Sequence, residues 1–593
     1  MKRLFLSLAI LLFWPVLVPA ADKTIIVIVS LDGFGANRLS PELNQKVLRH
    51  YAQKDSRSFF QAPDLPFLRN LSQSPGVLYK RNGIAPVFPS ITNTNHASLL
   101  TGKQPRDHRL VGNYFAEPVP GRGYKMVSFQ ASERKEFYEE IHPPEVILQN
   151  FNVGTVFWPS TSGPRTHDPR FSIPEIFLPD QVAPPFRSQQ SLFFYHSSFS
   201  LEEYAQLLHG QSVVGPEASE VLCTERSLRP LILPLLSQID SEKFYPQFIE
   251  TVSRVKQNCP AVSPLPPRVA LRFFLDLFNL RKGIESVERM IREGDKDHSL
   301  LFLHLITTDT AQHENRGVGF SFEMADRMLE KLNEVLDKTR NGNPLALILT
   351  ADHGVAFMEK EIFLEKFLIE SGMIAFNEKK GVGYLFDKTW DVAKKDRYYS
   401  FESPAYWSGV SGMHYSLRLK KPEEAANIVR LIRNGSFPGQ KQLGDCYYWE
   451  KPARLDSQAR QARLVAMSEK PVPEEVRSAL PNPFTFETAP HIFCVPKDSH
   501  TFFAQAKKGM NGEWIEKTAR GKGWHGYFAD EKSPELRALF LTTFQGDDTF
   551  WKTCLKKGFS SVQTTREVVK KIEKEILSRC LESPGSPPAG VSR

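Results

Sequence analysis

Several features that would narrow the function at once are missing from these 593 residues. The six cysteines form no C-x-x-C pair, so neither a thiolate metal site nor thioredoxin-type chemistry has support. The 75 basic and 67 acidic residues are spread along the chain, and no dense Lys/Arg run indicates a nucleic-acid groove. No internal repeat is present. What remains is an ordinary globular composition, long enough for one large core with insertions or for about two to four domains.

The N-terminus resembles a secretory signal peptide. Two basic residues precede an apolar run over residues 4–18, and small residues follow for cleavage after Ala20 or Ala21. An uncleaved membrane anchor is the alternative, but the run contains Pro15 and is short for a bilayer span of roughly 20 residues. We therefore expect residues 1–20 to be a signal peptide and the protein to be exported, either to a periplasm or to the cell exterior.

Export would place the cysteines in an oxidising environment, where disulfides persist. Six cysteines allow about 15 pairings. The simplest of them joins sequence neighbours, namely Cys223 with Cys259, Cys446 with Cys494, and Cys554 with Cys580.

Three apolar runs have the composition of buried strands, and acidic or imidazole side chains follow each of them. The runs and their followers are residues 24–31 with Asp32, residues 299–306 with Asp309 and His313, and residues 345–350 with Asp352 and His353. Each group alone is more typical of a turn, a cap or an incidental surface histidine. In open α/β sheets, however, ligands bind beyond the carboxyl ends of the strands, so these side chains are also candidate ligands.

Hydroxyl and amide side chains crowd into residues 89–96, just before a helix-like segment. Ser, Thr and Asn are preferred N-cap residues, so a capped helix start is the ordinary interpretation. A helix N-terminus also presents N–H groups and a positive dipole end to an anion. A hydroxyl such as that of Thr92 can attack a phosphorus centre there, provided that a bound metal helps it to lose its proton.

His525 lies in a glycine-flanked stretch near the C-terminal end, where backbone freedom allows close approach to a ligand, although a surface loop is the alternative. Together with the residues at the strand ends, His525 gives two nearly complete sets of metal ligands. Zinc takes imidazole nitrogen and carboxylate oxygen, and two metals roughly 3.5–4 Å apart suit an in-line phosphoryl displacement.

In this combination the chain resembles the alkaline phosphatase superfamily and, within it, the nucleotide pyrophosphatase/phosphodiesterase family. The matching segments occur in the family's order and are Leu31-Asp32-Gly33, Thr92 through His96 with Thr101-Gly102, Phe157-Trp158-Pro159, Asp309 through His313, residues 350–354 and His525-Gly526-Tyr527.

The resemblance implies an alkaline-phosphatase-like α/β fold, layered α/β/α, with a central, mostly parallel sheet and a largely helical cap insertion. It also implies an exported zinc phosphodiesterase acting on a small phosphodiester or nucleotide. Thr92 would be the nucleophile, forming a phosphoryl-threonine intermediate that water hydrolyses, and Asn95 would donate to a phosphate oxygen. Two Zn²⁺ ions per chain would be held, one by Asp309, His313 and His525, the other by Asp32, Asp352, His353 and the Thr92 oxygen.

Two departures from the family pattern limit what the resemblance implies. The usual motif is Thr-Phe-Pro-Asn-His, whereas here Thr94 adds a second hydroxyl; we prefer Thr92 because its offset from Asn95 matches. About 150 residues separate the Trp158 motif from the Asp309 motif, more than is usual, so substrate preference is not carried over.

Other functions stay open at this point. The neutral amide of Asn95 suits a singly charged diester, but Lys103 and Arg106 lie nearby in sequence and keep a phosphomonoesterase of the same superfamily as an alternative. A catalytically silent binding protein on this fold is the alternative from another class.

The chain divides into five predicted parts. They are the signal peptide, a first core part over residues 21–160, a helical cap insertion over residues 161–295, a second core part over residues 296–581 and a disordered tail over residues 582–593.

The insertion contains one clear amphipathic helix. Its apolar face is formed by Leu271, Phe274, Leu275 and Phe278, and such a face usually packs in a protein core. A lipid-binding face is the less common alternative and would bring membrane contact.

Overall fold

The structure of this protein is a computed structural model. It describes residues 23–51, 54–119, 123–128, 141–159, 161, 168–173, 223–259, 264–364, 367–368, 371, 398–399, 405–411, 413–419, 421–437, 439–450, 462–485, 489–497, 500–502, 515–526, 528–529, 533–546 and 549–581. The predicted signal peptide and C-terminal tail lie outside these residues and stay predictions.

The fold is built around β1 (Thr24–Leu31), whose β-branched run is buried along its whole length. It pairs in parallel with β6 (His298–Leu305) on one side and with β7 (Leu345–Thr350) on the other. The six-stranded order is β2-β17-β7-β1-β6-β5, with β17 antiparallel to both of its neighbours. The three remaining strands are β2 (Leu78–Tyr79), β5 (Phe151–Val156) and β17 (Phe540–Gln545). The predicted central, mostly parallel sheet is confirmed.

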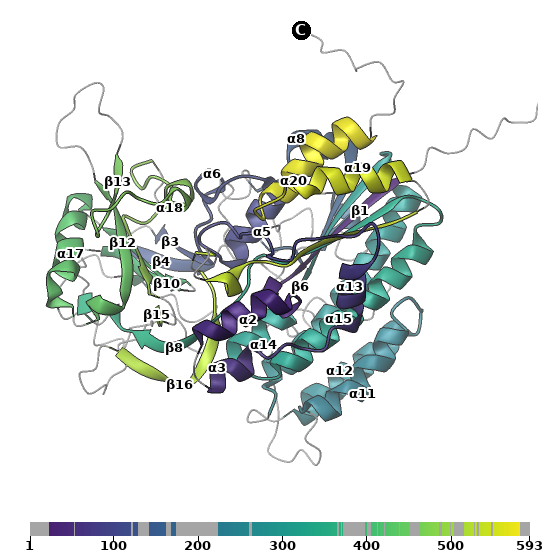
Figure 1. Cartoon of the computed structure of the whole chain (residues 1–593), viewed down its shortest axis with the longest axis horizontal. Coiled ribbons are helices and arrows are strands. Elements are labelled where there is room, and N and C mark those ends of the chain that lie inside the picture. The colour runs from purple at the N-terminus through teal and green to yellow at the C-terminus, as the bar shows by residue number, and fades with distance from the viewer. Residues whose placement is uncertain are drawn as a thin grey trace, which may run out of the picture.

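Helices cover both faces of this sheet, as Figure 1 shows: α13 and α15 lie on one side, and α19 and α20 on the other. Close approach of α13 to β6 depends on Gly283, where a Cβ would come within 3.1 Å of the Leu303 side chain. The predicted layered α/β/α architecture is therefore present. The helices around the sheet are α2 (Pro41–His50), α3 (Lys54–Phe59), α4 (Pro66–Gln73), α5 (Thr92–Thr101), α6 (Pro105–His108), α8 (Glu145–Asn150), α11 (Glu225–Ser237), α12 (Phe244–Asn258), α13 (Pro267–Glu293), α14 (Thr307–Glu314), α15 (Val318–Thr339), α19 (Thr549–Ser560) and α20 (Glu567–Lys571).

The apolar stripe predicted on α13 is buried in the protein. Phe248 of α12 contacts both Phe274 and Phe278, so α12 covers the stripe from outside. The predicted Cys223–Cys259 disulfide is confirmed, and it ties the start of α11 to the end of α12. The stripe is thus core, whereas the boundaries predicted for the insertion stay predictions. No helix among the described residues is both long enough and apolar enough to span a bilayer.

A smaller antiparallel sheet of five strands lies beside the central one, at the left of Figure 1. Within it Cys446 and Cys494 face each other in register and form the second predicted disulfide. The third predicted pair includes Cys580, whose side chain lies outside the described residues. The strands are β10 (Ala405–Ser411), β11 (His414–Leu419), β12 (Leu443–Glu450), β13 (Arg463–Ala466) and β14 (Ile492–Pro496).

A three-stranded sheet connects the two larger ones and positions His525. Its β16 (Ile515–Trp524) pairs antiparallel with β8 (Ala356–Ile362), so the chain after β16 returns toward the end of β7. There the Met413 N–H donates to the His525 carbonyl oxygen at 2.7 Å. The remaining elements are β3 (Tyr114–Val119), β4 (Gly123–Ser128), β9 (Tyr398–Tyr399), β15 (His500–Phe502), α17 (Ala425–Leu431), α18 (Glu474–Ala479), the π-helical η7 (Ile432–Ser436) and η10 (Ile572–Leu581), and the 3-10 helices η1 (Ala36–Arg38), η3 (Pro169–Phe171), η6 (Pro422–Glu424), η8 (Gln440–Gln442) and η9 (Pro534–Leu536).

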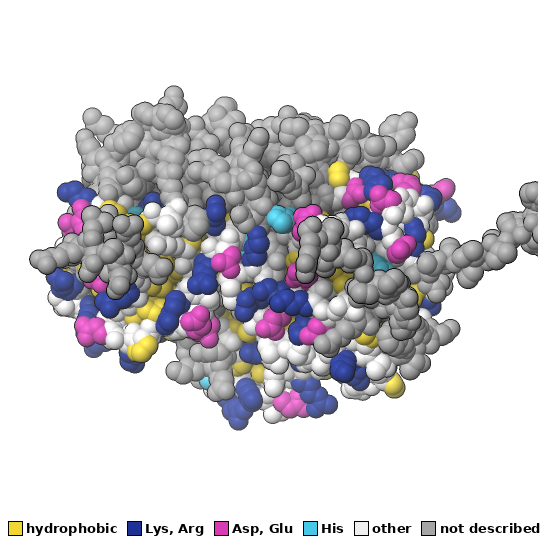
Figure 2. Space-filling model, turned by 90° about the horizontal axis from the view of Figure 1, so that it is seen from above, with side chains coloured by type: hydrophobic (Ala, Val, Ile, Leu, Met, Phe, Trp, Pro, Cys, Tyr) yellow, Lys and Arg dark blue, Asp and Glu magenta, His cyan; other side chains and the backbone are white. Residues whose placement is uncertain are grey.

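The net positive charge does not gather into a single patch on the face drawn in Figure 2. Lys and Arg side chains are interspersed there with Asp and Glu, and hydrophobic side chains show only in small groups. The coloured side chains of this view therefore form no continuous basic surface.

Candidate active site

The register of the central sheet brings the predicted ligands to one edge. Ser30 of β1 pairs with His304 of β6 on one side and with Thr350 of β7 on the other. Asp32 and Asp352 therefore leave the sheet side by side, and the chain after β6 enters α14, which carries Asp309. Parallel strands that end together are the physical reason why residues some 300 positions apart in sequence meet.

One group of ligands, the inner cluster, consists of Asp32, Asp352 and His353, and all three are buried. The His353 Nε2 atom lies 2.9 Å from Asp352 Oδ2 and 3.7 Å from Asp32 Oδ1. One ligand atom from each residue falls within 4.8 Å of the other two, which is close enough to share one metal ion.

The other group, the outer cluster, consists of Asp309, His313 and His525 and meets the same distance criterion. His313 Nε2 lies 3.1 Å from both Asp309 Oδ2 and His525 Nε2. The His525 ring stacks on His353 of the inner cluster with centroids 3.7 Å apart. The two predicted ligand sets are therefore adjacent, as a two-metal site requires.

The imidazole orientations favour a cation over mutual hydrogen bonding. The Nδ1 atoms of His313 and His525 lie 2.7 Å and 2.9 Å from the carbonyl oxygens of Gly523 and Ser90. A carbonyl only accepts, so each Nδ1 carries the proton, and in the neutral rings both Nε2 lone pairs point at each other across 3.1 Å. Metal-bound histidines have this arrangement, with the second ring nitrogen held by a backbone carbonyl.

The carboxylates of both clusters are held in the ionised form. Burial alone would raise the pKa of Asp309, but His313 and His525 outweigh it and lower that pKa well below its usual range. Burial is likewise outweighed at Asp352, where His353 and His96 lower the pKa. Burial, followed by the charge of His353, lowers the pKa of His525 to about 3. Ionised carboxylate oxygen is a donor that zinc takes together with imidazole nitrogen.

Two carboxylate oxygens provide a separate test of fit. Asp309 Oδ1 and Asp352 Oδ2 are buried and accept no hydrogen bond from the described residues. Leaving a buried carboxylate oxygen without a donor is costly, and a bound cation would remove that cost. The residues of both clusters therefore fit divalent metal ions.

Thr92 is the first residue of α5, and its hydroxyl faces the inner cluster. Its Oγ1 lies 3.4 Å from His353 Nε2. The N-cap position is occupied by Ile91, and no side chain caps the helix locally, so the ordinary interpretation of a capped start is wrong here. Thr94 Oγ1 is buried and has no hydrogen-bond partner in the described part of the chain, which agrees with the preference for Thr92.

Asn95 has a different task from the one predicted. Its amide is fully buried: the two N–H groups face the carbonyl oxygens of Val87, Pro89 and Ile91, which lie 3.2–3.3 Å from Nδ2, and Oδ1 accepts from the Val87 N–H and the Thr565 hydroxyl. All of these partners belong to the loop before α5 or to the segment before α20. The correction is that Asn95 fixes the loop that delivers Thr92, because side chains in the first helical turn lean back toward the preceding residues.

The motif spacing missed another amide side chain, that of Asn113, near the start of α5. Asn113 follows α6, and its Oδ1 accepts from the Asn93 N–H at 3.3 Å, which puts the amide at the first turn of α5 beside Thr92. No local pattern in the sequence singles it out. Lys103 and Arg106, by contrast, follow the C-terminal end of α5, about 15 Å along the helix from Thr92.

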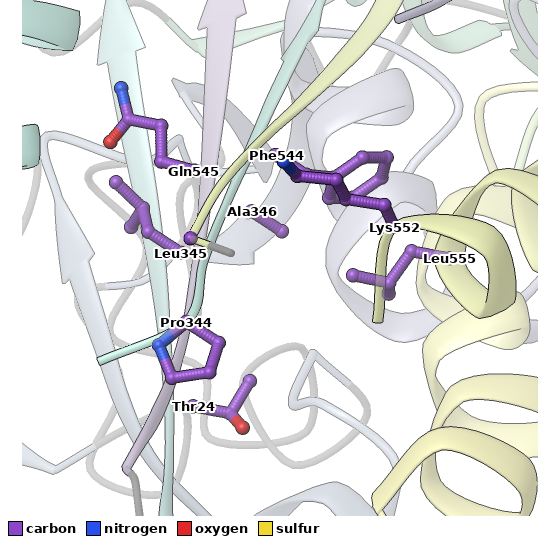
Figure 3. A pocket seen from close by; sticks show the side chains of 9 residues that line it. Thr24, Pro344, Leu345, Ala346, Phe544, Gln545, Lys552 and Leu555 are labelled. Atoms are coloured by element: carbon purple, nitrogen blue, oxygen red, sulfur yellow. The ribbon is translucent and has the colours of Figure 1, made fainter. Parts of the chain in front are cut away.

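A small cavity lies at the opposite edge of the sheet. Figure 3 shows Thr24 and Leu345 at the starts of β1 and β7 lining it together with Phe544 and Leu555. Its free space of about 10 Å³ is enough for one water molecule. The whole length of β1 separates it from Asp32, so it takes no part in the candidate site.

The chain is similar to several known proteins. A curated relative from Schizosaccharomyces pombe, an uncharacterized pyrophosphatase/phosphodiesterase, is 26% identical over 139 residues, which are 23% of this chain and only 24% of the relative. Murine ectonucleotide pyrophosphatase/phosphodiesterase 5 aligns with a TM-score of 0.42 and 14% identity over 88% of each chain. Phosphonoacetate hydrolase from Sinorhizobium meliloti 1021, solved with phosphonoformate, aligns with a TM-score of 0.40 and 14% identity over 88% of this chain and 90% of that one.

The family comparison is decisive because it spans most of the chain. The sequence model described as type I phosphodiesterase/nucleotide pyrophosphatase matches residues 26–528, from β1 to beyond His525. The chain therefore belongs to the type I phosphodiesterase/nucleotide pyrophosphatase family, whose members are hydrolases of phosphoester bonds.

Proposed function

We propose that this protein is an exported, zinc-dependent phosphodiesterase that cleaves a small phosphodiester or nucleotide through Thr92. The observation that carries the proposal is the convergence of six ligand side chains beside one hydroxyl at a helix N-terminus. These side chains come from the ends of β1, β7 and β16 and from α14. A binding protein that kept the fold only as a scaffold has no need of such a set.

Two zinc ions per chain fit the site, one in each cluster, with the Thr92 oxygen as a further ligand of the inner one. His313 and His525 present bare Nε2 atoms in the outer cluster, and Asp352 presents an oxygen without a donor in the inner cluster. Bound zinc would stabilise the negative charge of phosphoryl transfer and favour ionisation of the Thr92 hydroxyl.

The chain's own residues account for the rest of the chemistry. The Thr92 oxygen forms a bond to phosphorus while the bond to the leaving alcohol breaks, which leaves a phosphoryl-threonine. Hydrolysis by water releases the phosphate product and restores the hydroxyl. Asn113 and the first N–H groups of α5 lie where a non-bridging phosphate oxygen can be bound, the role first predicted for Asn95.

The charges around the clusters favour a diester over a monoester. Among the described residues, each ion pair found for Asp309 and Asp352 is with a histidine. Lys103 and Arg106, which kept the monoesterase alternative open, lie at the far end of α5. A monoester brings a second negative charge that fixed cations would have to neutralise, and neutral amide and N–H donors suit the single charge of a diester.

Turnover of bis(p-nitrophenyl) phosphate tests the proposal directly. Purified mature protein should release p-nitrophenol, EDTA should stop the release and added zinc should restore it. Protein shown to contain zinc but without turnover would contradict the proposal. A higher kcat/KM for p-nitrophenyl phosphate than for the diester would favour the monoesterase alternative.

A matched pair of threonine variants separates catalysis from binding. Thr92→Ala should lower kcat by about 10³-fold or more while the zinc content is retained, because the nucleophile is lost. Thr94→Val is the control: it removes a buried hydroxyl that has no hydrogen-bond partner among the described residues, and the variant should keep its activity. Equal behaviour of wild type and Thr92→Ala in every assay would favour the silent binding protein.

Export is supported by the two disulfides, since such bonds persist outside a reducing cytosol. The mature N-terminus of protein recovered from the exported fraction should follow Ala20 or Ala21. Retention of residues 1–20 in a membrane fraction would favour the anchor alternative.

A further inference from the structure

We infer that His304, which belongs to neither cluster, is a positioning residue that turns one oxygen of Asp32 toward the inner zinc ion. The inference rests on the proposed function, because it concerns the same metal site. His304 is the next-to-last residue of β6, is fully buried and stands in register with Ser30, two residues before Asp32. The parallel pairing of β1 and β6 therefore places its imidazole directly beneath the Asp32 carboxylate.

The two oxygens of Asp32 have separate neighbours. Oδ2 lies 3.1 Å from His304 Nε2, whereas Oδ1 lies 3.7 Å from His353 Nε2 and faces the inner cluster. Acceptors face both ring nitrogens of His304, the Asp32 carboxylate at Nε2 and the Phe157 carbonyl at Nδ1, and a neutral imidazole has one proton to donate. The charged carboxylate is the stronger acceptor, so we place the proton on Nε2, which donates to Oδ2. With Oδ2 held in this way, the carboxylate has one orientation, and that orientation presents Oδ1 to the metal position.

His304 is itself held on several sides. Its Nδ1 lies 3.2 Å from the Phe157 carbonyl oxygen, and the Phe157 ring stacks on the imidazole at 5.6 Å with an angle of 8° between the planes. The His96 ring closes the other side at 4.3 Å. Phe157 has a φ of +55°, which is unusual for a residue other than glycine. Strained backbone of this kind is maintained where the surrounding structure needs it, here where the Phe157 ring stacks on the imidazole.

Loss of this hydrogen bond should weaken metal binding without removing a metal ligand. An Asp32 side chain that is free to rotate would present Oδ1 only part of the time. Groups that orient metal ligands from outside the coordination sphere typically change metal affinity by about 10–100-fold when they are removed. The effect should fall on the inner zinc ion, because the hydrogen bond that is lost is made to Asp32, a residue of the inner cluster.

Two substitutions distinguish positioning from simple filling of space. In His304→Gln the amide nitrogen reaches the place of Nε2 and can still donate to Asp32. In His304→Asn the shorter side chain reaches only the place of Nδ1, so a polar group near Phe157 remains but the bond to Asp32 is lost. His491→Asn is the control, since His491 is a buried histidine directly before β14, far from the site in the fold, and its Nδ1 accepts from the Leu419 N–H.

The measurement is a zinc titration of metal-free protein against a competing chelator, followed by kcat and KM for bis(p-nitrophenyl) phosphate. We expect His304→Asn to lower the affinity for one of two zinc ions by about 10–100-fold and to lower kcat with little change in KM. His304→Gln should restore both values toward wild type, and His491→Asn should leave both unchanged.

Each outcome is decisive. Equal zinc affinities for His304→Asn and His304→Gln overturn the inference while leaving the proposed function standing. Wild-type protein that binds no zinc overturns both. If His304→Asn does not fold, His304→Met replaces it, because methionine has the length of glutamine and no donor; Met and Gln variants with the same zinc affinity would then overturn the inference.

Discussion

The inner and outer clusters use similar ligands but are attached to the fold in different ways. The inner cluster stands on the ends of two central strands, and its side chains are 0–1% exposed. The outer cluster stands on the short helix α14 and on the chain after β16, and the His313 side chain is 18% exposed. A ligand set at the ends of core strands can move only if the sheet moves. One on a short helix and a sheet edge can open locally.

The hydrogen bonds behind each cluster show the same difference. In the inner cluster, Asp352 Oδ1 accepts from the Gly33 N–H at 3.1 Å and from the His353 N–H at 2.9 Å, so a ligand also joins the ends of β1 and β7. In the outer cluster, α14 is held at its N-terminus by Asp276 of α13, whose carboxylate accepts from the N–H groups of Ile306 and Thr307 at 2.8 and 3.0 Å. The inner cluster is thus linked directly to the strand ends of the sheet, whereas the outer cluster is held through α14 and its hydrogen bonds to α13.

Metal removal is the strongest test of this comparison and should abolish activity completely. A chelator should extract zinc in two phases, a fast one from the partly exposed outer cluster and a slow one from the buried inner cluster, with activity lost in the fast phase. Zinc release followed with an indicator dye, beside turnover in the same samples, gives both time courses. In His313→Ala the fast phase should disappear. A single phase for both ions, or an unaltered fast phase in His313→Ala, would break the comparison.

Ligand removal should produce equal losses of activity but unequal losses of stability. Asp352→Ala and His313→Ala should each lower kcat/KM by about 10³-fold or more, since metal-assisted charge stabilisation is worth several kcal/mol. Asp352→Ala also leaves the buried N–H groups of Gly33 and His353 without an acceptor. It should therefore lower the free energy of unfolding of the zinc-free protein by about 3 kcal/mol. His313→Ala should cost about 1 kcal/mol or less. Denaturant unfolding of both variants measures the difference; equal stabilities would contradict it.

The ligands could be predicted because they follow from local patterns. Apolar runs predict β1, β6 and β7, and parallel strands bring the residues that follow them to one edge of the sheet. Asp32 and Asp352 were therefore accessible from the strand ends, and the family resemblance grouped them with His525, which no strand pattern would have assigned.

The amide beside Thr92 could not be predicted in the same way. Spacing within a motif favours a residue that is near in sequence, and Asn95 satisfied that spacing while its side chain is used by the preceding loop. Asn113 reaches α5 only through the path of the chain around α6. His304 was missed for a related reason: it lies inside an apolar run, and only the register of β6 against β1 shows that it meets Asp32.

The two asparagines provide the next prediction, on the substrate side of the inner cluster. Asn113→Ala should lower kcat/KM for the diester by about 10²-fold, the cost of losing one donor to a developing anion, with little loss of stability. Asn95→Ala should mainly destabilise the protein, by about 3 kcal/mol, because several buried loop groups lose their partners. Kinetics at a temperature well below both unfolding transitions, beside thermal unfolding, separates these effects. The reverse pattern would indicate that Asn95, and not Asn113, binds the phosphate oxygen of the substrate.

The last prediction tests the attachment of the outer cluster through Asp276. Burial raises its pKa to about 6, although hydrogen bonds from Thr307 and Ile306 and the charge of Arg272 oppose the rise. Between about pH 4 and pH 6, Asp276 is therefore protonated in the folded protein and ionised in the unfolded chain. The stability that this carboxyl contributes to the folded protein decreases as the pH rises through this window.

Asp276→Asn removes this pH dependence of the free energy of unfolding. Between pH 4 and pH 7 the zinc-free wild type should lose about 3 kcal/mol more than the variant, and the variant should bind the outer zinc ion more weakly while the inner one is unaffected. Denaturant unfolding at four pH values, with zinc titrations of both proteins, checks this: parallel stability curves or weaker binding of the inner ion would show that α14 is not held in place by Asp276.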